Sequence, residues 1–323
     1  MSTSERVAPP PDSHAAPRAG RPVIERIETR GAEVGQLPIH RALPARERRM
    51  VGAWCFLDHI GPIGHAAGHG LHVGPHPHIG LQTFTWMIEG EILHRDSLGY
   101  RQPIRPGEVN LMTAGCGIAH SEDAPTEQPG RLHAVQLWIA LPEAERRRSP
   151  AFQHHPELPR LSEGGFRATV LAGAHRGAHS PVEVHSPIIG LDLAAAAATR
   201  ADLPLEPRFE HAALVLSGEV RIESETLGPD TLLYLGSGRG RLELECRSAS
   251  RLLLIGGEPF GEDILLWWNF VARRPEEIEA AGRAWNERRH FGEVEGSPSA
   301  RLIAPDASGL RLRAAPRQPS GAS

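Results

Sequence analysis

Short apolar stretches separated by Gly and Pro turns run along most of this chain. In QTFTWMI (82–88), large apolar side chains alternate with threonines, which predicts a strand that has one face against a core. Glu89-Gly90 then begins a turn into a second strand at 91–93. The 34 Gly and 29 Pro residues bound further stretches of this kind at the intervals expected for turns between strands. The pattern predicts an all-β core.

The same arrangement occurs twice. IEGEI (88–92) and LSGEV (216–220) are each followed by a Pro or Gly turn and an apolar strand, RPGEVNLM (105–112) and GPDTLLYL (228–235). Duplication of a β-domain explains this better than chance similarity between two unrelated hairpins. We therefore expect two β-barrel domains, which occupy residues 23–150 and 151–295.

Helix signals are confined to residues 142–147 and 275–290. The second stretch opens on Pro275 and two glutamates and closes on Arg288-Arg289-His290, as expected for the two ends of a helix. Residues 1–22 and 296–323 contain much Pro, Ala, Ser and Arg without apolar periodicity. We expect both ends to be disordered extensions outside the fold.

Composition narrows the function classes. With 40% apolar and 23% charged residues, a chain of 323 residues is long enough for two packed domains. A net charge of −4 gives no strong field and indicates neither nucleic acid nor an anionic membrane as partner. All 35 basic residues are Arg, which excludes Schiff-base lysines and a Walker-type phosphate site.

The cysteines and the apolar runs indicate the cellular compartment of the protein. Cys55, Cys116 and Cys246 are odd in number and widely spaced, as expected for a reducing compartment. The sequence contains no secretory signal and no run of about 18 apolar residues. We expect a cytoplasmic monomer that does not enter membranes.

Histidines supply the candidate chemistry. Six of the 18 lie between His59 and His78, and this group ends in His76-Pro77-His78. Residues i and i+2 of a strand share a face, so His76 and His78 can present two imidazoles to one point. His120-Ser121-Glu122 has the same spacing. On facing strands of a barrel, the two pairs would surround one metal ion with three imidazoles and one carboxylate.

Long motifs carry a family resemblance. HPHIGLQTFTWMIEGEILHRDSLG (76–99), IRPGEVNLMTAGCGIAHSE (104–122), LHAVQLWIALP (132–142) and LLLIGGEPFGEDILLWWNFV (252–271) closely resemble the pirin family of the cupin superfamily. The resemblance implies a bicupin, two jelly-roll barrels with a few short helices and a C-terminal helix. It also implies metal ligands, which fall on these four positions: His76, His78, His120 and Glu122.

The rest of the cupin pattern is met less fully. Its usual glutamate position holds Gln82, so Glu122 must supply the only carboxylate. In the second barrel, alignment of Gly218 with Gly90 puts Pro204 and Glu206 where the HPH histidines stand. We therefore expect one metal ion per chain, in the first barrel.

Metal identity follows from the ligand types. Three imidazoles and a carboxylate without thiolate suit a borderline divalent ion. Four protein ligands leave coordination positions open, and both this feature and the resemblance favour Fe(II). Mn, Co, Ni, Cu and Zn are the alternatives.

The resemblance implies two functions. The first is a dioxygenase like the quercetinases among bacterial pirins, which would open a flavonol or similar aromatic hydroxy compound with O2. Glu122 would then also act as the catalytic base. The alternative is a non-enzymatic iron-binding redox or ligand sensor that regulates a protein partner. A metal-bearing isomerase is a third possibility, since the fold alone does not select a reaction.

Other conspicuous residues have simpler interpretations. We expect His59, His65, His69 and His72 to be solvated, and His94 and His133 to lie in strands or behind the metal ligands. Trp267, Trp268 and Phe270 are expected in core packing rather than in a ligand box.

Overall fold

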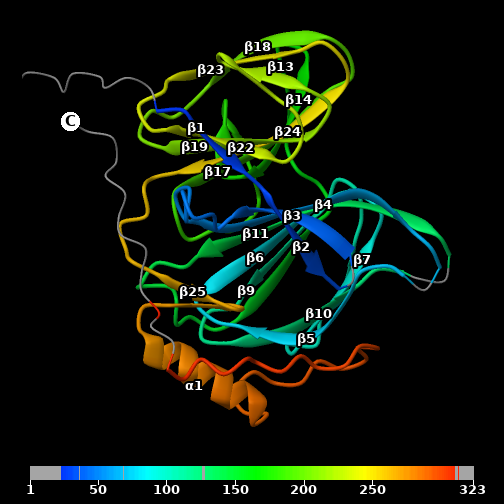
Figure 1. The fold of residues 1–323 in the computed structure, drawn as a ribbon, viewed down its shortest axis with the longest axis vertical. Helices are drawn as coiled ribbons and strands as arrows, with labels where there is room; N and C mark the ends of the chain where they lie inside the picture. The colour runs from blue at the N-terminus through cyan, green and yellow to red at the C-terminus, as the bar shows by residue number, and fades with distance from the viewer. Residues whose placement is uncertain (1–22, 36, 68, 126–127, 310–311, 313–323) are drawn as a thin grey trace, which may run out of the picture.

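Two β-barrels lie one above the other, and a helix packs beneath the first barrel (Figure 1). This computed structural model describes residues 23–35, 37–67, 69–125, 128–309 and 312. The predicted all-β, two-domain architecture is confirmed. The predicted disorder of residues 1–22 falls outside the described residues.

The first barrel consists of a seven-stranded and a four-stranded antiparallel sheet. The larger sheet has the order β12 (Ala151–His155), β9 (Val109–Thr113), β6 (Leu81–Glu89), β11 (Gly130–Ala140), β4 (Trp54–His65), β3 (Leu37–Leu43), β2 (Arg30–Val34). The smaller sheet has the order β5 (His72–His78), β10 (Ile118–Asp123), β7 (Ile92–Asp96), β8 (Arg101–Ile104).

The second barrel repeats this arrangement strand for strand. Its larger sheet has the order β1 (Glu25–Glu28), β22 (Thr231–Gly236), β19 (Glu210–Ser217), β24 (Ser250–Gly257), β17 (Ile188–Ala195), β14 (Phe166–Ala172), β13 (Arg160–Glu163). Its smaller sheet has the order β18 (Thr199–Pro204), β23 (Arg241–Cys246), β20 (Val220–Ile222), β21 (Glu225–Leu227). Two short ribbons complete the described strands: β15 (Ala174–His175) with β16 (Ala178–His179), and β25 (Leu265–Trp267) with β26 (Phe270–Ala272). The shared strand order agrees with the duplication that the sequence predicts.

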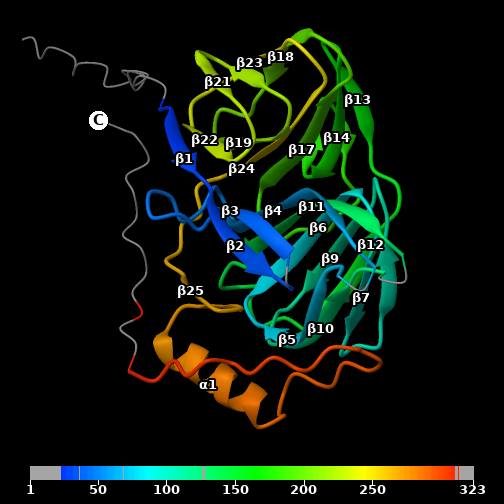
Figure 2. The same cartoon turned by 45° about the vertical axis from the view of Figure 1, so that its right-hand side comes forward.

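The two halves exchange their first strands. β1 leaves the first half and pairs with β22 of the second barrel, while β12 leaves the second half and pairs with β9 of the first barrel (Figure 2). The predicted domains, 23–150 and 151–295, are therefore not separate in space. Sequence periodicity identifies a strand but not its partner, which lies far away along the chain.

One apolar core joins the barrels. Side chains of both large sheets meet in it, among them Phe84 and Leu137 of the first and Leu214 and Leu253 of the second. Trp54 of β4 crosses the boundary, and its indole N–H lies 3.1 Å from the carbonyl of Gly256. Burial of this shared core gives the barrels a common source of stability.

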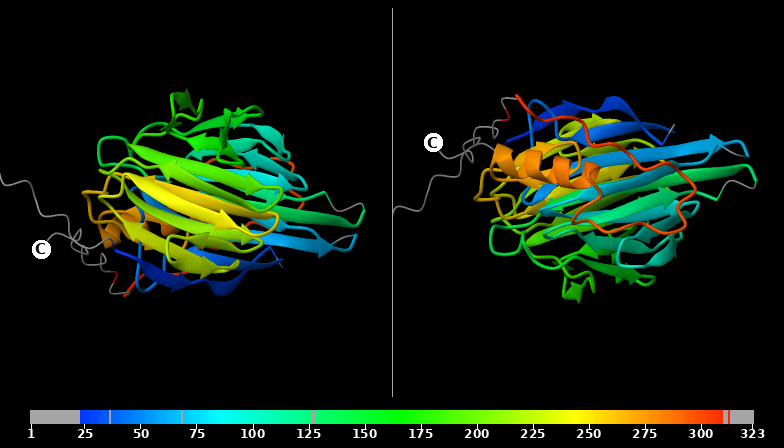
Figure 3. Two further views of the ribbon diagram at one scale, coloured as in Figure 1. Left: turned by 90° about the horizontal axis from the view of Figure 1, so that it is seen from above. Right: turned by 90° about the horizontal axis from the view of Figure 1, so that it is seen from below.

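A helical layer covers the outer face of the small first-barrel sheet (Figure 3). Helix α1 (Pro275–Asn286) buries Ile278, Ala281 and Trp285, which recur at helical spacing. Phe270 and Ala119 belong to the same apolar cluster, and the partly buried Trp267 and Trp268 pack against it, as the sequence analysis predicts for these aromatics. Within the described residues, no helix has the length and apolar character needed to cross a membrane.

The helices differ from prediction at two places. Residues 143–147 form turns rather than a helix. Helix α1 ends at Asn286 instead of His290, because Arg288 and His290 take positive φ angles of 55° and 77°.

The expected loose C-terminal tail is wrong for residues 297–309. Ala304 and Ala307 are buried in the helical layer, and the indole N–H of Trp285 donates to the carbonyl of Leu302 at 2.8 Å. The backbone N–H of Leu302 in turn donates to Pro75 of β5 at 2.9 Å. Scattered small apolar residues without periodicity thus suffice to fix a segment when backbone groups bind a neighbouring strand. Leu312 also packs against the helical layer, while residues 310–311 and 313–323 lie outside the described residues.

The packed C-terminal segment can be tested with two neighbouring residues. Ala304 is 2% exposed and Ile303 is 70% exposed. We expect Ala304→Glu to lower the free energy of unfolding in urea by about 2–4 kcal/mol, because it buries a charge. The control Ile303→Glu should change it by less than about 0.5 kcal/mol. Equal, small effects of the two variants would mean that the segment does not pack.

A buried histidine pair predicts loss of stability in acid. His59 and His133 lie with their Nε2 atoms 2.9 Å apart, and burial lowers their pKa values to about 3 and 4. As the pH falls below about 6.5, the ordinary histidine pKa, these two side chains become protonated in the unfolded chain but stay neutral in the folded chain. The free energy of unfolding therefore decreases from about pH 6.5 to pH 4. In urea titrations across this range, His59→Gln should lessen the slope by up to about 1 kcal/mol per pH unit. The exposed control His179→Gln should retain the wild-type slope; a wild-type slope for His59→Gln would refute the assignment.

Candidate metal centre

Three histidines converge on the inner face of the small first-barrel sheet. His76 and His78 alternate along β5, and His120 of β10 is the cross-strand partner of His76. Their ligand nitrogens all lie within 4.8 Å of one another, the one such group among the described residues. The Nε2 atoms of His78 and His120 are 3.1 Å apart. Three of the four predicted ligands are thus brought together.

Strand alternation explains this convergence. The residues next to the histidines face outward, where Ala119 and Ile79 belong to the apolar cluster of the helical layer. Strand β26 approaches the end of β5 closely, and the N–H of Val271 donates to Ile79 at 3.1 Å. Gly80 permits this approach, because its φ is 71° and a Cβ there would lie 2.1 Å from the carbonyl oxygen of Val271.

Backbone carbonyls orient two of the rings. His76 Nδ1 lies 2.9 Å from the carbonyl of Gly74, and His78 Nδ1 lies 3.0 Å from the carbonyl of Asn269 in the β25–β26 turn. Because a carbonyl only accepts, each Nδ1 carries the proton and each Nε2 presents its lone pair to the centre. Ligand histidines are held in this way in many metal sites. His120 Nδ1 faces another imidazole, that of His94, at 3.4 Å.

Burial keeps the three rings neutral. Desolvation lowers the pKa of His76 to about 4, and it holds the pKa values of His78 and His120 well below the usual range, with neighbouring imidazoles adding to the effect. At neutral pH the rings therefore have free lone pairs, which metal coordination requires. The donor set fits a divalent transition metal.

Glu122 is not a member of the three-histidine group. It lies two residues after His120 on β10, where the register with β5 shifts and Val73 becomes its partner. Desolvation raises the pKa of the Glu122 carboxyl to about 7, and the neighbouring Asp123 adds to the rise. Its roles as ligand and base stay predictions.

Gln82 does not belong to the centre. The Gln82 amide donates to Thr113 Oγ1 at 2.9 Å and to the carbonyl of Glu183 at 3.2 Å, in the second half of the chain. Gln82 and Phe84 lie on the same face of β6, and Phe84 belongs to the core between the barrels. Gln82 therefore points away from the interior of the first barrel. The cupin glutamate position is therefore not available to a metal ion here.

An aromatic wall stands beside the histidines. The indole of Trp138 meets the His78 ring edge to face at 5.1 Å and stacks on Phe56 at 4.0 Å. Met112 belongs to the same buried cluster. These residues were not among those predicted from the sequence, although the alternation of LHAVQLWIALP places Trp138 on one face of a strand.

Of the other histidines, His94 lies where the sequence predicted, and His59 does not. His59 was expected in solvent but is 1% exposed, because it pairs with His133 of the neighbouring strand. His94 lies behind His120, as predicted. In the second barrel, Pro204 ends β18 and Glu206 is exposed, while the interior is filled by apolar side chains such as Leu203. That the second barrel binds no metal stays a prediction.

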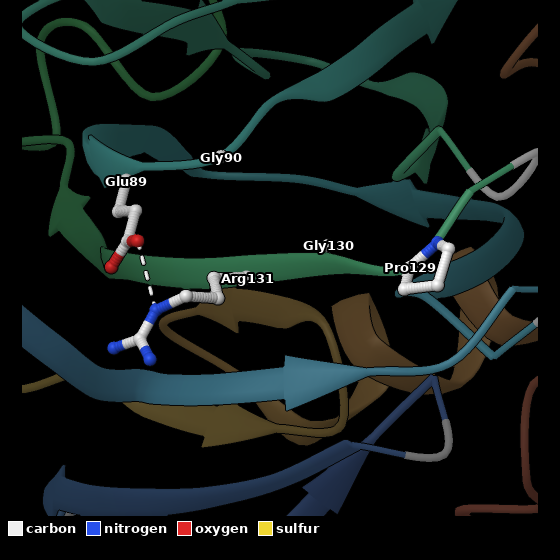
Figure 4. A pocket seen from close by; sticks show the side chains of 5 residues that line it. All are labelled: Glu89, Gly90, Pro129, Gly130 and Arg131. Carbon is white, nitrogen blue, oxygen red and sulfur yellow. Dashed lines mark hydrogen bonds and ion pairs between the residues drawn. The ribbon is translucent and has the colours of Figure 1, made fainter.

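An open hollow of about 510 Å³ lies elsewhere on the first barrel (Figure 4). It is lined by Glu89, Gly90, Pro129, Gly130 and Arg131, and Arg131 Nε lies 2.9 Å from Glu89 Oε1 across it. This exposed ion pair satisfies both charges. None of the clustered histidines borders the hollow.

Comparison with known proteins identifies relatives along most of the chain. The family model Pirin matches residues 36–139, and the model of the Pirin C-terminal cupin domain matches residues 190–292. A Pseudomonas aeruginosa protein provisionally named quercetin 2,3-dioxygenase is 49% identical over 308 residues, 94% of this chain and 97% of the relative. A pirin-like protein of Caulobacter vibrioides is 38% identical and covers 81% of this chain and 93% of its own.

A solved structure extends the similarity to the fold. The crystal structure of a quercetin 2,3-dioxygenase from Acinetobacter baumannii matches with a TM-score of 0.87 and 49% identity, over 90% of this chain and 97% of that one. Two family models that together cover more than half of the chain, and relatives of this identity, lead to one conclusion. The chain belongs to the pirin family of two-domain cupin proteins.

Proposed function

We propose that this protein is a metal-dependent dioxygenase of the quercetinase type, which opens a flavonol or a similar aromatic hydroxy compound with O2. The observation that carries the proposal is the convergence of three neutral imidazoles on one point beside an aromatic wall. The names of the relatives from P. aeruginosa and A. baumannii support the same reaction class. Both oxygen atoms of O2 would enter the opened product.

The metal we propose is Fe(II), held by His76, His78 and His120, with Glu122 as fourth ligand. Imidazole and carboxylate donors without thiolate suit Fe(II), while Mn, Co, Ni, Cu and Zn are the alternatives that metal analysis would distinguish. When bound, a divalent ion supplies Lewis-acid stabilisation of a deprotonated hydroxyl and a template for substrate and O2.

The protein side chains would bind and deprotonate the substrate. Trp138 stands edge to face with His78, and a planar flavonol that enters beside the histidines would pack against this indole. Glu122 would take the hydroxyl proton onto a carboxylate oxygen, which leaves the substrate as an anion next to the histidines. Burial of this wall excludes water from the reacting groups. The monomeric state and the cytoplasmic location stay predictions.

Turnover should depend on the histidine cluster. We expect Fe-loaded wild-type protein with about one metal ion per chain to consume a flavonol and O2 together, measured by absorbance and an oxygen electrode. His78→Ala should lose bound metal and activity, because a site reduced to three of its four proposed ligands loses much of its affinity. His72→Ala is the control, since His72 lies on the same strand and pairs with Asp123 outside the cluster.

A negative result would select the alternative function. If Fe-loaded wild-type protein consumes no O2 across a panel of flavonols and related aromatic compounds, the dioxygenase proposal is wrong. The metal-binding regulatory protein would then be the better interpretation.

Glu122→Gln separates coordination from proton transfer. A Gln carbonyl can still contact the ion but cannot accept the substrate proton, so we expect retained metal and a loss of turnover of about 100-fold or more. Metal content is measured in the same sample. Wild-type turnover in the variant would exclude a general-base role for this residue.

A further inference from the structure

Two buried polar side chains, His94 and Asp96, form a hydrogen-bonded series behind His120. His94 Nδ1 is 3.4 Å from His120 Nδ1, and His94 Nε2 is 3.1 Å from Asp96 Oδ2. The three residues are 4%, 1% and 2% exposed for His94, His120 and Asp96. Asp96 is the cross-strand partner of His120, since β7 pairs with β10.

With neutral imidazoles, the donors and acceptors of Asp96, His94 and His120 allow one arrangement. Asp96 Oδ1 accepts the backbone N–H groups of Leu98 at 2.9 Å and Tyr100 at 3.1 Å, and Oδ2 remains for His94. A carboxylate only accepts, so His94 Nε2 carries the proton and His94 Nδ1 has a lone pair. His120 must then donate from Nδ1, which leaves its Nε2 free to face His76 and His78.

Packing holds the intermediate ring in place. The imidazole of His94 stacks on Phe152 with centroids 4.5 Å apart and an interplanar angle of 14°. Phe152 belongs to β12, the strand that the second half of the chain adds to the first barrel. Tyr100 contacts the same Phe152 ring at 5.0 Å, next to the turn that Asp96 organises. The orientation of His94 is thus set on one face by Phe152 and at one edge by Asp96.

We propose that Asp96 and His94 are positioning residues that hold His120 in its Nδ1–H tautomer and so prepare it to bind the metal. The inference rests on the metal site of the proposed function, but not on dioxygenase turnover. His76 and His78 obtain the same tautomer from backbone carbonyls, so His120 alone of the three depends on side chains. Removal of such outer partners lowers metal affinity 10–100-fold in other metal sites.

Asp96→Asn tests the proposal with little change of shape. The two backbone donors keep the amide oxygen of Asn at the Oδ1 position, which turns the NH2 group towards His94. His94 Nε2 must then accept, His94 Nδ1 must donate, and the proton of His120 moves to Nε2, where it blocks the metal. We expect the dissociation constant for Co2+, measured by chelator competition, to rise 10–100-fold.

A spectroscopic signature distinguishes this role from a structural one. Long-range 1H–15N correlation of the metal-free protein reports which ring nitrogen carries the proton. Wild-type His120 should show the Nδ1–H pattern, and Asp96→Asn the Nε2–H pattern. An unchanged His120 tautomer together with Co2+ affinity within about twofold of wild type would overturn the proposal.

A second pair of variants decides the matter if Asp96→Asn does not fold. His94→Phe retains a ring against Phe152 but offers no acceptor, whereas His94→Gln can accept from His120 and donate to Asp96. Weaker Co2+ binding by His94→Phe, with recovery in His94→Gln, supports the proposal. Equal affinities for these two variants contradict it. Because each readout is metal binding or a tautomer, inactivity towards flavonols would refute the proposed function alone.

Discussion

The pairing of His76 with His120 is the constraint on which the rest of the centre depends. In this register His76, His78 and His120 share the inner face of the small sheet, while Ala119 and Ile79 face the helical layer. A slip by one residue would turn the imidazoles towards the helix and bring apolar side chains into the barrel. The helical layer and the C-terminal segment bind the β5 segment through backbone hydrogen bonds. They therefore help to hold β5 in the register that places the histidines inside the barrel.

The centre also needs both halves of the chain. Asn269, which follows the second barrel, supplies the carbonyl behind His78, and Phe152 of β12 supports His94. The exchanged strands and the shared apolar core hold these contributions in place. Although the histidines all come from the first barrel, their orientation is a property of the whole two-barrel molecule.

The alternation of side chains along a strand could be predicted from the sequence, whereas contacts with distant parts of the chain could not. Alternation in HPH and HSE is a property of neighbouring residues, and it correctly placed His76, His78 and His120 on one face. The direction of Gln82 depends on which face of β6 meets the second barrel, and the exchange of β1 and β12 depends on distant partners. Residues 297–309 were misjudged because backbone groups of Leu302 and Ala304, rather than apolar periodicity, attach the segment to β5 and to helix α1. The position of Glu122 depends on a register shift that the sequence does not reveal.

The central claim is that one divalent ion binds through the Nε2 atoms of three imidazoles that the fold holds ready. X-ray absorption spectroscopy of the Fe-loaded protein counts those imidazoles most directly, because multiple scattering from the ring identifies each one. The account predicts three imidazoles per metal ion, completed by oxygen ligands and without sulfur. One imidazole or none, or a sulfur ligand from a cysteine, would contradict it.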